Sequence, residues 1–465
     1  MIRSGTLPTL SAITAFVVGG IVISAIAVVA MRATAIGSAQ VIDLSGLGRR
    51  VLIIAPHPDD EVLATGGTIR RLIESGAQVK VVIVTAGDSY RRAADRQPGV
   101  SGPAAYLALG EMRHRESMTA ASVLGLSDSD VVSLGYADGA TTAMWNGSWN
   151  TTATAAGRTE STSVPYAWAA AAGAPLNGRG LASQLEQQIR DFAPDTIITP
   201  DVHETHPDHA MTAAFSMYAM NAVGFSGRHL SDIVHFRHYP YPWAHLPALA
   251  LNPPPQLLQD GTDWLALPLR PADQAAKGRA IAEYRSQTAI ADMSLYMRAF
   301  IRTNELFASR VPARPATASE DGRPGPGVVG TVDVTPRPVI APAPGTRQPR
   351  IASMRMVRGP HAMWIGLVCD RAPRPEETYT VGARLFGHGT PQRLDISVNA
   401  GSVQTSGAYA DSAVPADVGT EIEGSTLWIV VPGDVLDGRT RLMLGAAASY
   451  AGGNPMRTAW TEVDL

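Results

Sequence analysis

Residues 49–61 read RRVLIIAPHPDDE and join a short apolar run to a polar string that directly follows it. Residues 51–55 are apolar at every position, as expected for a strand that is buried on both faces of a parallel sheet. Apolar residues then recur with helical spacing over residues 61–76, where Gly76 is a stop signal. This strand–turn–helix unit predicts an α/β fold, in which ligands bind at the carboxyl ends of the strands.

The same alternation continues along the chain. Because each predicted strand is apolar on both faces, we expect a Rossmann-like, mostly parallel sheet with helices on both faces. The further strands are expected at residues 79–85, 131–134, 196–199 and 233–239, and the further helices at 104–124, 181–192, 209–221 and 273–309, the last interrupted near Asp292.

A change of composition divides the chain after this region. Residues 311–349 are rich in proline and lack apolar periodicity, which is typical of a semi-extended linker. Residues 350–465 contain short alternating runs separated by Gly, Pro and Asp, and they predict a C-terminal all-β, sandwich-like domain. Carbohydrate binding, packing on the α/β domain and a spacer role all remain open for it.

The N-terminal segment, residues 1–35, is predicted to be a transmembrane anchor or a signal segment. Residues 10–31 are uncharged and apolar, and at about 1.5 Å per residue they are long enough to span the roughly 30 Å hydrocarbon layer. An A-x-A-like site at residues 33–35 leaves a cleaved signal open, and a buried helix is a third reading. We expect a membrane-anchored protein with most of the chain extracytoplasmic, or a secreted one if the segment is cleaved.

The amino-acid composition excludes several classes of protein and of metal site. The 465 residues are 45% hydrophobic and 17% charged, so the chain can bury substantial cores. A net charge of −3 argues against a surface devoted to nucleic acid. The single cysteine, Cys369, excludes intrachain disulfides, thiolate zinc clusters and Fe–S ligation within one chain. A metal ion would therefore need histidine and carboxylate ligands.

A long segment at residues 140–179 has no clear period. It is rich in Ala, Thr and Gly, and we interpret it either as a functional loop or lid or as a plain insertion. Its aromatic side chains could stack on sugar faces or could hold the loop against the body of the protein. These side chains are Trp145, Trp149, Tyr166 and Trp168.

Two His-Pro-Asp strings follow predicted strands, HPDDE at residues 57–61 and HPDH at residues 206–209. His57 and Asp60 are three residues apart at a strand-to-helix turn, and His209 can supply a third ligand from another strand end. Two imidazoles and one carboxylate leave open positions for water, as in a catalytic zinc site, although iron also suits these ligands.

The neighbouring side chains suit acid–base chemistry. Asp59 can take a proton from metal-bound water, and His206, as an imidazolium, can stabilise an oxyanion or protonate a leaving amine. Asp208 can orient His206. The alternative is that these aspartates only cap helices, which does not account for two complementary motifs at strand ends. The polarity of the loop explains His203 and Glu204 as well as chemistry does.

No pattern assigns a role to the remaining histidines, which we expect to be structural or at the surface. They include His114, His229, His235, His238 and His245.

Five separated strings carry a resemblance to a known family. They are APHPDDE at 55–61, Leu109-Gly110 followed by Arg113 and Glu116, LGYADG at 134–139, HPDH at 206–209 and YRSQ at 284–287. With these strings the chain resembles the LmbE-like/PIG-L family of zinc-dependent de-N-acetylases. We assign the LmbE/PIG-L-like deacetylase domain to residues 49–309.

The resemblance implies a Zn²⁺ ion and a set of site residues. The metal ligands would be His57, Asp60 and His209, with Asp59 as the general base and His206 as the electrostatic or acid partner. Arg113 and Asp138 would contact the substrate sugar. An Arg113 ion pair with Glu116 and an Asp-Gly turn at Asp138 are the structural alternatives.

The expected function is hydrolysis of an N-acetyl group from an N-acetylglucosamine-type amino sugar in a glycolipid, glycan or glycoconjugate. The enzyme would be a zinc-dependent N-deacetylase, a hydrolase of linear amides, with Asp59 activating the metal-bound water. A non-catalytic extracytoplasmic glycan-binding protein is the alternative. A dinucleotide-binding oxidoreductase is disfavoured, because no G-x-G-x-x-G follows a strand. The exact substrate, the native metal and the oligomeric state remain open.

Overall fold

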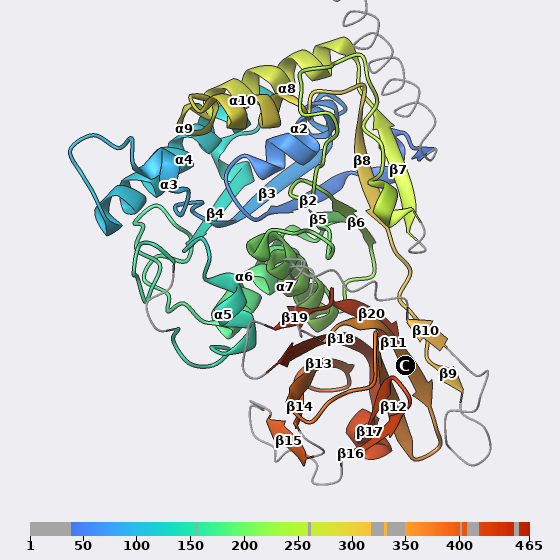
Figure 1. Ribbon diagram of the computed structural model, residues 1–465. Coiled ribbons are helices and arrows are strands. Elements are labelled where there is room, and N and C mark those ends of the chain that lie inside the picture. Colours follow the sequence, from blue (N-terminus) through green and yellow to red (C-terminus); the bar gives the residue numbers. More distant parts are fainter. Residues whose placement is uncertain are drawn as a thin grey trace, which may run out of the picture.

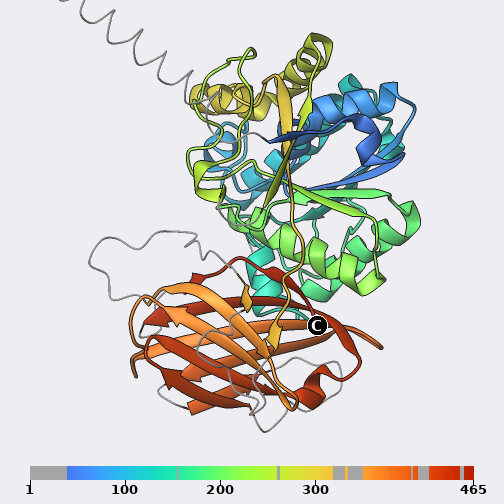
Figure 2. The same cartoon turned by 90° about the vertical axis from the view of Figure 1, so that its right-hand side faces the viewer.

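The computed structural model describes residues 39–153, 157–258, 262–317, 330–332, 349–399, 402–406, 418–450 and 455–465. The chain forms an α/β unit followed by a β-sandwich unit that packs beneath it in the view of Figure 1. The second view shows the same two units in contact (Figure 2).

An eight-stranded sheet forms the centre of the α/β unit. Its strands from β6 to β4 pair in parallel, whereas β8 runs antiparallel to both β6 and β7. The sheet is therefore mostly parallel. In spatial order the strands are β1 (Gln40–Val41), β7 (Asp263–Pro268), β8 (Asn304–Ser309), β6 (Arg228–Asp232), β5 (Thr196–Pro200), β2 (Arg50–Ala55), β3 (Gln78–Thr85) and β4 (Val131–Tyr136).

Helices cover both faces of this sheet because its central strands are apolar on both sides. Val51 and Ile53 of β2 belong to the core that includes α2 (Asp60–Glu74), α4 (Pro103–Leu124) and α8 (Pro271–Glu283). Leu52 and Ile54 of the same strand belong to a second core with α6 (Gly178–Phe192) and α7 (Pro207–Val223). The shorter helices are α3 (Arg91–Ala94), α5 (Thr141–Asn146), α9 (Arg285–Thr288), α10 (Ala291–Arg298), η1 (Leu44–Leu47), η2 (Asp128–Asp130), η3 (Pro255–Leu257) and η4 (Gly433–Leu436).

Two predicted elements are wrong. The strand expected at residues 233–239 lies earlier, at β6, because Arg228–Asp232 pairs in register with β5. The helical region expected at 273–309 ends in a strand, β8, which pairs with β7 along its whole length. In both cases a pairing with a distant segment outweighs the local pattern.

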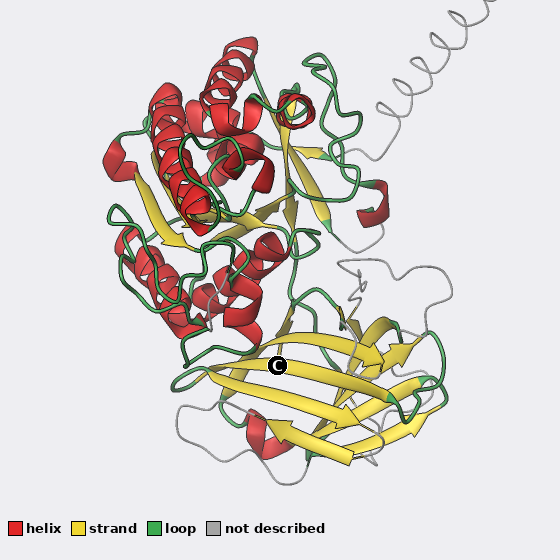
Figure 3. Ribbon diagram, turned by 60° about the vertical axis from the view of Figure 1, so that its left-hand side comes forward, coloured by secondary structure: helices red, strands yellow, loops and turns green. Residues whose placement is uncertain are grey.

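The β unit consists of two sheets (Figure 3), antiparallel except for the parallel pair of β9 and β11, around one core. One sheet has the order β10-β11-β12-β17-β16 with β9 beside β11, and the other has the order β15-β14-β13-β18-β19 with β20 beside β18. The strands are β9 (Ala316–Thr317), β10 (Gly330–Val332), β11 (Ile351–Arg358), β12 (Ala362–Cys369), β13 (Glu377–Gly387), β14 (Gln392–Asn399), β15 (Ser402–Ser406), β16 (Gly419–Glu423), β17 (Thr426–Pro432), β18 (Arg439–Tyr450), β19 (Met456–Arg457) and β20 (Thr461–Asp464).

The aromatic side chains of the 140–179 segment hold it against the protein. Trp145 is fully buried, and its ring lies 4.7 Å from the ring of Phe215 on α7. Trp149 and Tyr166 are also buried in the second core. Of the two interpretations of these aromatics, the structure favours packing.

The transmembrane helix of the predicted fold also requires a correction. Among the described residues, no helix combines the length and the apolar character needed to cross a bilayer. This finding is against the transmembrane helix of the predicted fold and the membrane-anchored, extracytoplasmic location that depended on it. The segment on which the prediction was based, residues 10–31, lies outside the described residues.

Candidate metal centre

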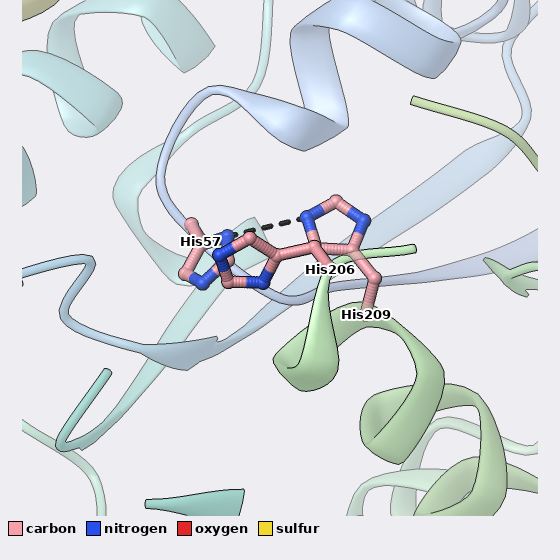
Figure 4. Close-up of side chains that lie close together, drawn as sticks. All are labelled: His57, His206 and His209. Carbon is pink, nitrogen blue, oxygen red and sulfur yellow. Dashed lines mark hydrogen bonds between the residues drawn. The ribbon is translucent and has the colours of Figure 1, made fainter. Parts of the chain in front are cut away.

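The predicted site residues meet at the carboxyl ends of β2 and β5. These neighbouring strands are followed by helices on opposite faces of the sheet, α2 and α7, so that a crevice opens between them. His57 follows β2, while His206 precedes α7 and His209 lies in its first turn. Figure 4 shows the three imidazoles grouped at this point.

Three ligand-type atoms approach one another closely in the crevice. Asp60 Oδ2 lies 3.1 Å from His57 Nδ1 and 3.0 Å from His209 Nε2. The two imidazole nitrogens lie 3.3 Å apart, although the residues are 152 positions apart in the chain. The ligand atoms of a tetrahedral zinc ion with bonds of about 2.0–2.1 Å would be about 3.3 Å apart, so the spacing fits a single ion.

In His57 and His209, the second ring nitrogen, which does not point to the shared position, faces a carboxylate. His57 Nε2 lies 3.4 Å from Asp208 Oδ2, and His209 Nδ1 lies 3.3 Å from Glu204 Oε1. Donation of a proton to these carboxylates leaves the lone pairs of His57 Nδ1 and His209 Nε2 directed at the common point. Metal-binding histidines are commonly oriented in this way.

Electrostatics at the site also fits a cation. Asp60 Oδ1 is buried and has no hydrogen-bond partner among the described residues. Burial acts to lower the pKa of His209, but the carboxylates of Asp60 and Glu204 outweigh burial and raise this pKa to about 9. The buried carboxylates thus favour positive charge where the ligand atoms meet.

Asp59 lies beside these atoms but faces another partner. Its Oδ2 is 2.9 Å from Arg113 Nη2, which also donates to the carbonyl of Pro58. Burial raises the pKa of Asp59 to about 7, and Arg113 opposes this rise. Asp59 has a φ of 117°, a left-handed value that is uncommon for a residue with a side chain and is often found at functional sites.

His206 differs from its predicted state. Its Nδ1 accepts the Asp208 backbone N–H at 3.3 Å, so the ring proton of the neutral imidazole is on Nε2. Burial, followed by the nearby His57 and His209, lowers the pKa of His206 to about 3. We therefore expect a neutral imidazole at neutral pH, not the imidazolium of the sequence-based hypothesis.

The Asp208 side chain also has a different partner from the one expected. Its carboxylate contacts His57, accepts a 2.6 Å hydrogen bond from Gly139 N and accepts another from Thr141 Oγ1. Because those contacts occupy it, Asp208 orients His57 and not His206.

Arg113 and Asp138, the two expected sugar contacts, both line a cavity of ≈ 430 Å³ together with His57, Asp59 and His206. Arg113 pairs with Asp59, while Glu116 accepts hydrogen bonds from Ser286. Asp138 accepts from Ser89 N at 3.1 Å and keeps an oxygen 3.7 Å from His57 Nε2. Both residues are therefore close to the candidate metal ligands.

Two residues that no sequence pattern assigned to the site, Glu204 and His235, lie against His209. Glu204 orients His209 and also accepts from the backbone N–H groups of Val234 and His235. The His235 ring lies 4.7 Å from that of His209. His235 lies three residues after the end of β6, and the strand wrongly expected at 233–239 concealed this position near a strand end.

The fold and the site together define an α/β protein with a candidate histidine–aspartate metal centre at a switch point of the sheet. Residues 52–220 match the PIG-L family model, described as GlcNAc-PI de-N-acetylase. The resemblance to the LmbE-like/PIG-L family that was stated from the sequence is thus confirmed for this part of the chain.

Curated relatives match the same part of the chain. The 1D-myo-inositol 2-acetamido-2-deoxy-alpha-D-glucopyranoside deacetylase of Tsukamurella paurometabola is 31% identical over 187 residues, 38% of this chain and 57% of the relative. The protein of the same name from Rhodococcus opacus is 32% identical over 178 residues, 38% of this chain and 54% of the relative. The diacetylchitobiose deacetylase of Thermococcus kodakarensis is 24% identical over 189 residues, 40% of this chain and 54% of the relative. The chain thus spans little more than half the length of these relatives.

Proposed function

We propose that this protein is a zinc-dependent hydrolase that removes the acetyl group from an N-acetylglucosamine-type amino sugar in a glycan or glycoconjugate. The observation that carries the proposal is the mutual approach, within 3.0–3.3 Å, of His57 Nδ1, Asp60 Oδ2 and His209 Nε2, next to a cavity that His57 and Asp59 both line. The relatives named as amino-sugar deacetylases support the choice of substrate class.

His57, Asp60 and His209 would hold the zinc ion. Bound there, zinc would act as a Lewis acid on the amide carbonyl of the substrate. Asp208 and Glu204 keep the two imidazoles in the tautomers that this binding requires.

Asp59 is the proposed general base. Its carboxylate would accept a proton from the attacking water and pass that proton to the leaving amine nitrogen, so that water and amide give acetate and a free amine. Arg113, at 2.9 Å, holds the carboxylate in place. Because Asp59 is not one of the proposed metal ligands, its removal should spare metal binding.

The neutral His206 would donate its Nε2 proton to the oxyanion that develops on the carbonyl oxygen. Asp138 would bind a sugar hydroxyl, because it lines the cavity and retains an oxygen near His57. Arg113 lines the same cavity, but its contact with Asp59 makes it first a positioning residue for the base.

The test compares the zinc-loaded full chain with its Asp59→Asn variant. Acetate release would be measured from N-acetylglucosamine, diacetylchitobiose and N-acetylglucosaminyl inositol. We expect a kcat lower by about 10²–10⁴-fold in the variant, with one zinc ion per chain retained, because general-base catalysis contributes about that much.

Failure of the unmodified protein to release acetate from any of these compounds would overturn the proposal. So would an Asp59→Asn variant of unchanged kcat. Glycan binding without any acetate release would instead favour the non-catalytic alternative.

A further inference from the structure

The larger of two cavities near the candidate metal centre lies between the α/β unit and the β unit. It has a volume of ≈ 800 Å³, within the range of about 300–1,000 Å³ that is typical of ligand pockets. Asp138 and His206 line both this cavity and the ≈ 430 Å³ cavity that contains His57 and Asp59. A ligand that reacts in the smaller cavity can therefore extend past these two residues into the larger one.

Buried arginines and aromatic rings hold the β wall of the larger cavity in place. The Arg384 guanidinium lies 5.3 Å from the Trp145 ring centroid and 4.9 Å from that of Trp460. Arg393 lies 4.1 Å from the Trp149 centroid and donates a 2.8 Å hydrogen bond to the Trp145 carbonyl. These contacts join the two units directly beside the cavity, so its wall has a defined position relative to the metal centre.

Arg457 contributes a positive charge to this wall. It lies on β19, opposite Ala447 of β18, and lines the larger cavity. Within the part of the chain that the structure describes, its guanidinium has no hydrogen bond or ion pair. Asp395, which lines the same cavity, is already paired with Arg384 at 2.8 Å. Burial lowers the pKa of Arg457, as expected for a cation that is partly removed from water without a partner.

We infer that the β unit forms a second substrate subsite, in which Arg457 binds an anionic group, carboxylate or phosphate, on the part of the substrate beyond the N-acetylated sugar. Asp138 and Asp208 on the α/β side of the cavity would repel such a group, whereas Arg457 would attract it. The charge difference across the cavity would thus orient the substrate, with its amino sugar towards His57 and Asp59. This inference rests on the proposed function and narrows its substrate class to acidic glycoconjugates.

The experiment measures equilibrium binding by calorimetry, with the full zinc-loaded chain carrying Asp59→Asn so that the acetyl group remains in place. The three probes are N-acetylglucosamine linked to glucuronic acid, the same disaccharide with the carboxylate converted to a carboxamide, and N-acetylglucosamine linked to glucose 6-phosphate. A charge-assisted hydrogen bond predicts that an anionic probe binds about 10- to 100-fold more tightly than the neutral one.

Arg457→Gln should abolish this preference, and Arg457→Lys should retain most of it. Arg358→Gln is the matched control, because it removes the same charge from an exposed position on β11 of the same unit and should leave the preference unchanged. A gain confined to the carboxylate or to the phosphate probe would support the inference and identify the source of the anion.

Equal binding of all three probes, or a preference that persists in Arg457→Gln, would overturn the inference. These outcomes are distinct from failure of the proposed function. Arg457-dependent binding without acetate release from the unmodified chain would support the subsite and refute the proposed deacetylase activity. Acetate release without an Arg457-dependent preference would support the deacetylase activity and refute the subsite.

Discussion

Replacing Glu204 by glutamine would remove a negative charge from the group that orients His209 while the size of the side chain is kept. Glu204 Oε1 accepts three hydrogen bonds, from Val234 N at 2.5 Å, His235 N at 3.0 Å and His209 Nδ1 at 3.3 Å. A glutamine oxygen can still accept the two backbone hydrogen bonds. The loss should therefore be confined to the charge that holds the imidazole and raises its basicity.

The expected loss of zinc affinity follows from the removal of this one charge. Loss of a carboxylate that orients a metal-binding histidine typically lowers metal affinity by 10- to 100-fold, or about 1.4–2.7 kcal/mol. The zinc Kd of Glu204→Gln would be measured by competition with a chelator of known affinity. Acetate release at saturating zinc should recover most of the activity, because the ligands themselves are unchanged.

Glu186→Gln provides the control for this measurement. Glu186 pairs with Arg190 on α6, away from the site residues, and its replacement should leave the zinc Kd unchanged. A Glu204→Gln variant whose Kd differs by less than about twofold from that of the unmodified protein would refute the reasoning, because His209 would then not depend on this carboxylate.

Two further predictions concern stability. Lys277→Met should lower the free energy of unfolding, measured by urea titration, by about 3–5 kcal/mol. The reason is that the fully buried Glu305 carboxylate, 2.7 Å from Lys277 Nζ, would lose its counter-charge. A loss of free energy below about 1 kcal/mol would contradict this. Burial acts to raise the pKa of Asp201, but Arg310 and His203 outweigh it and hold this pKa well below its usual range. The stabilisation by Asp201 is therefore fully present above an unfolded-state pKa of about 3.9 and is lost as the pH falls below it, by up to about 1.4 kcal/mol per pH unit. Urea titrations between pH 5 and 3 should show a steeper loss for the unmodified protein than for Asp201→Asn, and equal slopes would disprove the assignment.

The sheet could be predicted from the sequence wherever a strand is buried on both faces. Residues 51–55 are apolar throughout, residues 79–85 are apolar except for Lys80 and Thr85, and both segments are strands in the structure. The edge region beyond β5 could not be predicted in this way. β6 is RHLSD and β8 is NELFAS, so neither carries the continuous apolar run of a central strand, and their place depends on pairing with distant segments.

In the candidate site, too, some contacts could be predicted from the sequence and others could not. His57 and Asp60 could be paired from the sequence because three residues at a strand-to-helix turn bring their side chains to one point. The partner of Asp208 could not be predicted, because His57 is 151 residues away. His206, the expected partner, is only two residues from Asp208 in the sequence, but its ring accepts a hydrogen bond from the Asp208 backbone N–H and none from the side chain.

The sequence by itself determined the ligand types, their local spacing and their location after apolar strands, since these depend on neighbouring residues and on side-chain chemistry. Only the tertiary structure decided which carboxylate faces which imidazole, that burial lowers the pKa of His206, and that a β strand far along the chain supplies Arg457 to a cavity beside the centre. Those features depend on how β2 lies beside β5 and how the β unit packs on α5 and α7. Such contacts come from the packing of whole elements, and no local pattern of residues specifies them.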